Sequence, residues 1–148
     1  MKPSTMFFED FQEGQEFISP GRTISEADIV NFAGVSGDYN PIHIDAEFAK
    51  KTFFGERIAH GLLILSIASG LLHDLGIIAG SILAFTGLEW KFKKPARIGD
   101  TVRGKFKILK TRALKDQGFV IFGAQILNQK DEIIQEGQWN LVVSKKPA

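Results

Sequence analysis

The sequence predicts an α+β fold, in which an antiparallel β-sheet wraps around one long central helix. Three observations lead to this prediction. Residues 60–75 are apolar on nearly every side and stop at Gly76, as expected of a buried helix with a glycine cap. The chain that follows is rich in strand formers, and from Thr101 its apolar and charged residues alternate. Polar turn sequences at residues 115–118 and 128–131 separate the later strands.

The composition is that of one folded domain. The chain has 148 residues, 44% hydrophobic and 24% charged, so we expect a single domain over residues 1–148. The formal net charge of +1 and the lack of a dense basic run argue against a nucleic-acid partner.

The absence of cysteine excludes disulfides and thiolate sites and fits a cytoplasmic protein. The start of the sequence lacks the apolar core of a secretory signal. The longest apolar run, residues 61–72, is about half the ~20 residues of a membrane-spanning helix, so no membrane partner is expected.

The elements before the long helix are short. A strand is expected at residues 15–18, followed by a helix that begins at Thr23, because Thr23 and Glu26 have the spacing of a capping box. The buried face of this helix is expected to contain Ile29, Phe32 and Ala33. Gly34 and Gly37 are expected to end it, and Asp45 to cap a second helix over residues 46–51.

The strands after the long helix are expected at residues 81–92, from residue 101 onward, at 118–127 and at 133–143. Alternation is clearest in the second of these. There, Val102, Phe106 and Ile108 are expected to face one side, and Arg103, Lys105 and Lys107 the other. The aromatic and lysine residues at positions 90–95 are interpreted as a two-sided strand with a solvated lysine face.

The segment most suggestive of chemistry is residues 36–43, Ser-Gly-Asp-Tyr-Asn-Pro-Ile-His. Pro41 fixes its own φ and pushes Asn40 toward an extended conformation, while Gly37 allows a sharp turn before Asp38. The loop is therefore expected to be stiff on both sides of its polar groups.

Asp38 and His43, five residues apart across this bend, are expected to converge on one small molecule. A carboxylate beside an imidazole is suited to general acid/base work on water. In an extended segment, Ile42 and Ile44 would point opposite to His43 and anchor it in the core. The alternative is ordinary turn chemistry, since Asp, Asn and Pro favour turns without any catalytic role.

Residues 36–43 resemble the signature of the MaoC-like (R)-specific enoyl-CoA hydratases, the hydratase 2 family. The resemblance continues through residues 57–63 (Arg-Ile-Ala-His-Gly-Leu-Leu) and residues 94–102 (Lys-Pro-Ala-Arg-Ile-Gly-Asp-Thr-Val). It implies a hot-dog fold, which is an antiparallel sheet around a long helix. It also implies (3R)-specific hydration of a trans-2-enoyl thioester, or the reverse dehydration, with coenzyme A or phosphopantetheine as the substrate carrier.

The resemblance also implies roles for particular residues. Asp38 and His43 match the family's catalytic pair, and Asn40 matches the residue that supports the loop. Gly61 matches the glycine whose N–H bonds the thioester carbonyl, and Ser69 lies where a helix serine supports the pair in some members. His60 either assists at the carbonyl or bonds to backbone at the start of the helix. No metal or other cofactor is expected, because His43, Asp45 and His60 lack a recognised metal-ligand spacing.

Two other functions stay open at this point. Hot-dog thioesterases commonly carry an acidic residue on or just before the central helix; residues 61–73 contain none, but Glu56 precedes the helix. The other alternative is a non-catalytic acyl-thioester binding subunit, which the presence of both Asp38 and His43 disfavours. The resemblance further implies a homodimer, or a dimer of dimers, that joins two sheets into one. Charges such as Lys105 and Lys107 guarding the sheet edge are the alternative.

Overall fold

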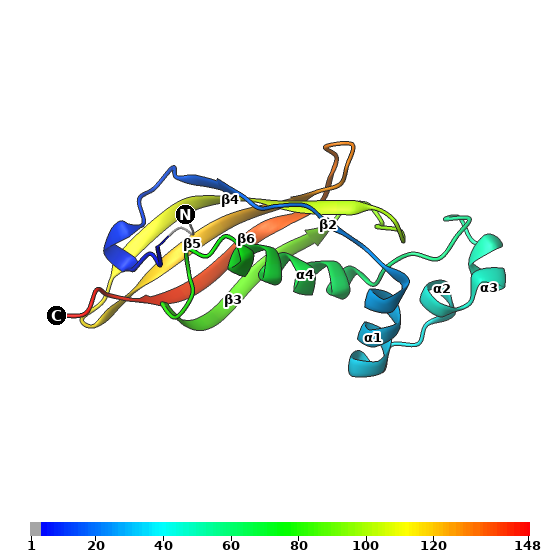
Figure 1. The fold of residues 1–148 in the computed structure, drawn as a ribbon, viewed down its shortest axis with the longest axis horizontal. Helices are drawn as coiled ribbons and strands as arrows, with labels where there is room; N and C mark the ends of the chain where they lie inside the picture. Colours follow the sequence, from blue (N-terminus) through cyan, green and yellow to red (C-terminus); the bar gives the residue numbers. More distant parts are fainter. Residues whose placement is uncertain (1–3) are drawn as a thin grey trace.

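A computed structural model describes residues 4–148; residues 1–3, which the expected domain includes, lie outside the described part. The chain folds into a six-stranded antiparallel sheet with a long helix packed along one face (Figure 1). The strand order is β1-β4-β5-β6-β3, and β2 also pairs with β4. The strands are β1 (Glu16–Ile18), β2 (Arg22–Thr23), β3 (Ile82–Phe92), β4 (Thr101–Ala113), β5 (Gln117–Leu127) and β6 (Ile133–Ser144). The helices are η1 (Phe8–Asp10), α1 (Glu26–Ser36), α2 (Pro41–Ile44), α3 (Ala46–Lys50) and α4 (Gly61–Asp74).

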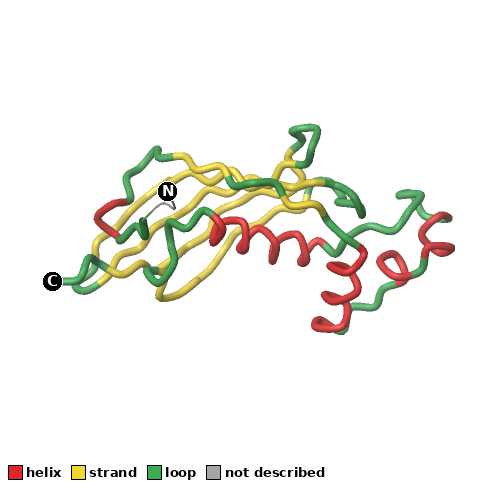
Figure 2. Tube along the Cα trace, viewed as in Figure 1, coloured by secondary structure: helices red, strands yellow, loops and turns green. Residues whose placement is uncertain are grey.

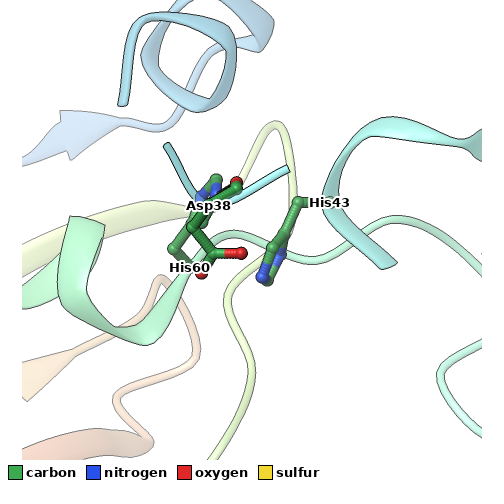
Figure 3. Close-up of side chains that lie close together, drawn as sticks. All are labelled: Asp38, His43 and His60. Atoms are coloured by element: carbon green, nitrogen blue, oxygen red, sulfur yellow. Dashed lines mark hydrogen bonds between the residues drawn. The ribbon is translucent and has the colours of Figure 1, made fainter. Parts of the chain in front are cut away.

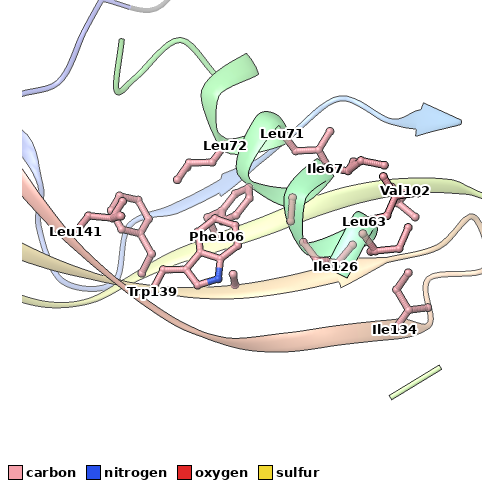
Figure 4. Close-up of a cluster of buried hydrophobic side chains, with 14 of the residues drawn as sticks. Leu63, Ile67, Leu71, Leu72, Val102, Phe106, Ile126, Ile134, Trp139 and Leu141 are labelled. Atoms are coloured by element: carbon pink, nitrogen blue, oxygen red, sulfur yellow. The ribbon is translucent and has the colours of Figure 1, made fainter. Parts of the chain in front are cut away.

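The core lies between α4 and the inner face of the sheet (Figure 4). From the helix come Leu63, Ile67 and Leu71, and from the sheet Phe106 and Trp139, all at most 6% exposed. Burying a side chain of this size contributes about 1.5–3 kcal/mol. The α+β fold and the long helix are therefore as predicted, and α4 is fixed against the strands along its length.

One face of α4 differs from the prediction. Its apolar sequence suggests a helix covered on all sides, yet Leu62 is 58% exposed, and Ser66, Ser69 and Gly70 are also exposed. The prediction missed this because small residues such as serine and glycine do not stand out as a polar face. In the single chain, α4 is covered on one side only.

The four long strands begin within about one residue of the predicted positions, and β3, β5 and β6, for which an end was predicted, also end there; β5 alternates strictly between buried and part-buried residues. The edge of the sheet is not where the sequence suggested. Lys105 and Lys107 lie on β4, between β1 and β5, so they guard no edge. The strand order ends in β1 on one side and β3 on the other, and four large apolar side chains are exposed on the edge strand β3: Leu83, Phe85, Leu88 and Phe92.

The prediction of the start of α1 was wrong by three residues. Its N-cap is Ser25, whose hydroxyl accepts from the Asp28 N–H while the Asp28 carboxylate accepts from the Ser25 N–H. Thr23 instead belongs to β2 and pairs with Thr101. The sequence contains two overlapping patterns of the capping-box type, and pairing of Thr23 with a distant strand decides between them.

Helices α1, α2 and α3 extend beyond one end of the sheet and form an overhang over residues 26–60 (Figure 2), with Ile29 of α1 joining the core. Asp45 caps α3 by accepting from the Phe48 N–H, as predicted. The loop 36–43 lies within this overhang, and the chain returns from it directly into α4. Among residues 4–148, no helix is long and apolar enough to span a membrane.

Candidate active site

The loop with the predicted pair starts at a helix end. Gly37 caps α1 with a φ of 75°, a conformation that favours glycine, and its N–H bonds to the Ala33 carbonyl. The Asp38 N–H then donates to Ser36 Oγ, and Asp38 Oδ1 accepts from the Asn40 N–H at 3.2 Å. The turn chemistry suggested by the sequence is therefore present, and it uses one oxygen of the Asp38 carboxylate.

The segment after Asn40 is helical, and the prediction of an extended segment was wrong. Asn40 is the N-cap of α2, accepting from the Ile42 N–H, and Pro41 occupies the first helical position. Proline favours that position because its missing N–H has no partner there in any case. In this helical turn Ile44 is 41% exposed, so it does not anchor His43 in the core.

His43 is held by its own ring instead. Its Nδ1 lies 2.7 Å from the Ile58 carbonyl oxygen, and the residue is 9% exposed. Because a carbonyl oxygen only accepts, Nδ1 carries the hydrogen, and the neutral ring keeps a lone pair on Nε2. Nε2 is therefore available as a base.

His60 proves to be part of the same cluster. It is the N-cap residue of α4 and is 2% exposed, yet its ring makes no capping bond. Its Nε2 lies 2.9 Å from the Asp38 backbone oxygen, and its ring stacks on His43 with centroids 3.8 Å apart and planes at 26°. The sequence left its role open between the carbonyl and the helix backbone; the structure instead bonds it to the backbone of Asp38.

Figure 3 shows these three side chains together. One polar atom from each of Asp38, His43 and His60 lies within 4.8 Å of the other two. A water oxygen bonds at about 2.8 Å from each partner, so two atoms this far apart are within reach of one water molecule. The expected proximity of Asp38 and His43 is present, and His60, whose role the sequence left open, lies beside them.

Such a trio also raises the question of a metal ion. Zinc bound by imidazole needs the ring lone pairs to converge on one point about 2.0–2.1 Å away. The two rings are stacked nearly face to face, so their in-plane lone pairs do not converge. In addition, His60 Nε2 and His43 Nδ1 are occupied by carbonyl oxygens. The arrangement of donors suits a bound water better than a metal.

Gly61, the expected donor to a carbonyl, is the first residue of α4. The first N–H groups of a helix lack partners within it and lie at the positive end of its dipole. Buried Gln135 fixes the position, since its Nε2 donates to the Gly61 carbonyl at 3.0 Å while its Oε1 accepts from Trp90 Nε1 at 2.8 Å.

A cavity of about 310 Å³ opens beside Gly61 and is lined also by Ile58, Ala59, Ile64, Phe92 and Gln135. A larger hollow of about 610 Å³ on the outer face of the sheet contains none of these site residues.

Ser69 and Glu56 have other partners. The Ser69 hydroxyl donates to the Ser66 carbonyl within α4, which is the usual use of a helix serine. Glu56 pairs with Arg97, with 2.6 Å between Oε1 and Nε. Neither bond joins the residue to the cluster of Asp38, His43 and His60.

An ion pair ties the overhang together. The Arg57 guanidinium forms two bonds to the Glu26 carboxylate, of 2.8 and 2.6 Å, linking the segment before α4 to α1. Hydrogen bonding from Arg57 holds the pKa of Glu26 below its ordinary value, and Glu26 in turn raises the pKa of Arg57. The pair braces the two sides of the site loop.

Comparison with known proteins gives consistent results. The sequence matches the family described as MaoC like domain over residues 10–129. It is 40% identical to the (R)-specific enoyl-CoA hydratase of Rhodospirillum rubrum over 116 residues, which cover 78% of this chain and 77% of that protein. It is 34% identical to Protein MaoC of Klebsiella aerogenes over 143 residues, which cover 96% of this chain but only 40% of that longer protein.

Solved structures agree with the sequence comparisons. The MaoC-like dehydratase from Rhodospirillum rubrum superimposes with a TM-score of 0.87 and 30% identity, covering 97% of this chain and 99% of that one. A Mycobacterium tuberculosis protein with a double hot-dog fold superimposes with a TM-score of 0.81 and 17% identity, covering 97% of this chain and 45% of that one. At this low identity the similarity is evidence for the fold alone. The predicted hot-dog fold is confirmed.

Proposed function

Because this chain belongs to the MaoC-like domain family, we propose that it catalyses (3R)-specific hydration of trans-2-enoyl-CoA to (3R)-3-hydroxyacyl-CoA, or the reverse dehydration. The chain is a hydratase/dehydratase of thioesters, an enzyme of the hydro-lyase class. The observation that supports the finer proposal is the juxtaposition of Asp38 and His43, with a free Nε2 on a buried imidazole next to a carboxylate. A cytoplasmic location fits the absence of cysteine.

In the proposed step, one water molecule bonds to Asp38 and to Nε2 of His43. The imidazole takes a proton as the water oxygen forms its bond to C3, and the π electrons move toward the thioester carbonyl. The imidazolium then returns a proton to C2, so that one water has been added across the double bond. Asp38 keeps its charge, orients the water and stabilises the imidazolium.

The negative charge on the carbonyl oxygen needs a donor, and we assign this role to the Gly61 N–H. A preorganised donor of this kind contributes on the order of 3 kcal/mol to lowering the barrier. Asn40 supports the loop as the cap of α2. We assign Ser69 a supporting role only as a residue that stabilises α4, because its hydroxyl bonds to a carbonyl within that helix.

The step uses no metal or redox cofactor, since the stacked imidazoles provide a base rather than converging ligands. Coenzyme A or phosphopantetheine enters as the carrier of the substrate.

A thioesterase would need a carboxylate aimed at the carbonyl, and Glu56 is paired with Arg97 on an exposed loop instead. The lysines at positions 93 and 94 pair with Glu136 and Glu132, which weakens any case for a nucleic-acid surface.

The proposed partner is a second copy of this chain. The edge strand β3 exposes unpaired backbone together with Leu83, Phe85, Leu88 and Phe92, and α4 exposes Leu62 on its uncovered face. A long apolar edge strand is an aggregation hazard unless another strand covers it. Pairing β3 with β3 of a second copy would join the two sheets into one, and two such dimers could associate further.

The test is an assay with enoyl-CoA substrates from crotonyl-CoA upward. Loss of enoyl absorbance without release of free thiol, and a (3R) product by chiral analysis, are the expected results. Release of free thiol at the rate of substrate loss would identify a thioesterase. An exclusively (3S) product would contradict the proposed stereochemistry.

A further inference from the structure

His60 is a buried polar residue that packing alone does not explain. Its ring is 2% exposed, and its Nδ1 is buried without a hydrogen-bond partner among the described residues. Buried polar atoms are nearly always bonded, and an unbonded one in a folded protein calls for a functional explanation. An apolar ring of the same size would avoid the unpaired atom.

The contacts of the ring indicate what it does. Nε2 donates to the Asp38 backbone oxygen, 22 residues earlier in the chain, and one ring face stacks on His43. The edge-to-face contact with Phe32 of α1, at 4.9 Å between centroids, holds the ring on another side. His60 therefore fixes both members of the catalytic pair relative to the start of α4, where Gly61 follows directly.

The bond to Asp38 also sets the tautomer. A carbonyl oxygen cannot donate, so the hydrogen of neutral His60 is on Nε2, and Nδ1 holds a lone pair. His43 has the opposite tautomer, because its Nδ1 donates to Ile58. In their neutral forms the stacked rings therefore have opposite tautomers, and only His43 keeps a free Nε2.

We propose that His60 is a positioning residue for the hydration step, holding Asp38 through its backbone oxygen and His43 through ring stacking. Its Nε2 is already bonded to the Asp38 backbone oxygen, so in this proposal it acts through the pair and not on the water. The expected effect on turnover rests on the proposed function. The expected tautomers of His43 and His60 do not, and they can be measured without any activity. A displacement of about 1 Å at a catalytic group can lower turnover on the order of 100-fold.

Three variants separate the contributions of the ring. His60→Gln retains a donor that reaches Asp38 but loses the stacked ring, whereas His60→Phe retains an aromatic ring without the donor. The matched control is His73→Gln, at the exposed end of the same helix. We expect kcat for crotonyl-CoA to fall about 10- to 100-fold in His60→Phe with little change in KM. We also expect a smaller loss in His60→Gln and none in the control.

Thermal unfolding distinguishes positioning from a structural role. Because phenylalanine removes the unpaired Nδ1 as well as the bond from Nε2 to Asp38, we expect the two effects to offset and His60→Phe to unfold at a temperature close to that of the unmodified protein. A purely structural role predicts the reverse, with lowered stability and normal turnover per folded molecule. That result, or normal kcat in His60→Phe, would overturn the proposal.

Nitrogen NMR of the histidine rings tests the geometry directly. The chain has three histidines, so the ring signals are few and the variants assign them. We expect His60 with its hydrogen on Nε2, His43 with its hydrogen on Nδ1, and His73 as an exchanging mixture. A hydrogen on Nδ1 of His60 would contradict the inference even if no variant folds. Expected tautomers in a protein without hydratase activity would instead count against the proposed function alone.

Discussion

The substitution Asp38→Asn separates catalysis from turn formation at the residue where the two overlap. Asp38 is exposed, and its Oδ1 accepts one bond from the Asn40 N–H at 3.2 Å. An asparagine oxygen can accept the same bond, so the turn survives and only the negative charge is lost. We expect the free energy of unfolding to change by less than about 1 kcal/mol, the value of one ordinary hydrogen bond.

The effect on turnover is expected to be much larger. General acid/base groups contribute about 10²–10⁴-fold, and even the lower limit corresponds to about 2.7 kcal/mol in the barrier. We therefore expect kcat for crotonyl-CoA to fall at least 100-fold. Initial rates from enoyl absorbance give kcat and KM, and urea unfolding gives the stability.

The matched control is Asp45→Asn, seven residues further along the overhang. Its Oδ1 makes the same type of local bond, accepting from the Phe48 N–H at 2.9 Å, and asparagine caps helices as well as aspartate. Its kinetics are expected to match those of the unmodified protein. Near-normal kcat in a folded Asp38→Asn protein would refute the catalytic role and leave Asp38 as a turn residue.

Three further predictions follow from the structure. In Gly61→Ala the new Cβ would lie 2.8 Å from Cδ1 of half-exposed Phe92, so either the ring or the start of α4 must move. We expect a reduced kcat and a change in the free energy of unfolding within about 1 kcal/mol, measured by the same two assays. Unchanged kinetics would count against the Gly61 N–H as the donor to the carbonyl. Because Arg57 lowers the pKa of Glu26, this pair stabilises the protein above the unfolded-state pKa near 4.5, and the stabilisation disappears as pH falls through the lower folded-state pKa. Urea unfolding should therefore show Glu26→Gln less stable than the unmodified protein at pH 6, with the difference vanishing in strong acid; a difference independent of pH would point to another cause. If two copies pair through β3 as proposed, Leu88→Lys on this exposed edge strand should lower the mass measured by light scattering from that of a dimer to that of a monomer, and a dimer mass retained in the variant would place the interface elsewhere.

The sequence predicted the sheet and α4 well because local patterns determine them. Alternation in β4 and β5 and the glycine after α4 mark the elements within one or two residues. The start of α1 was not determined locally. Thr23 pairs with Thr101, 78 residues away, and that contact selects Ser25 as the cap. A single sequence gives no sign of such a long-range pairing.

The candidate site shows the same division. The helical turn of α2 was missed although its signal was present, since Asn40 followed by Pro41 is a good start for a helix. His60 is a different case. Its ring is used 22 residues away, at the Asp38 backbone, and a histidine before an apolar helix has no pattern that indicates this contact. The family resemblance supplied the pair, and only the three-dimensional arrangement supplied its third member.

The two interpretations of residues 36–43, turn and acid/base site, are not exclusive, because the turn positions the catalytic group. Asp38 Oδ1 is held by the Asn40 N–H, the Asp38 backbone is held by Ser36 and His60, and Asn40 caps the turn that carries His43. Each bond satisfies a loop group and also restricts the carboxylate relative to the imidazole. Preorganised groups need little rearrangement in the transition state, which is the main source of electrostatic catalysis. The local turn residues are therefore the means by which an exposed loop holds an acid/base pair in place.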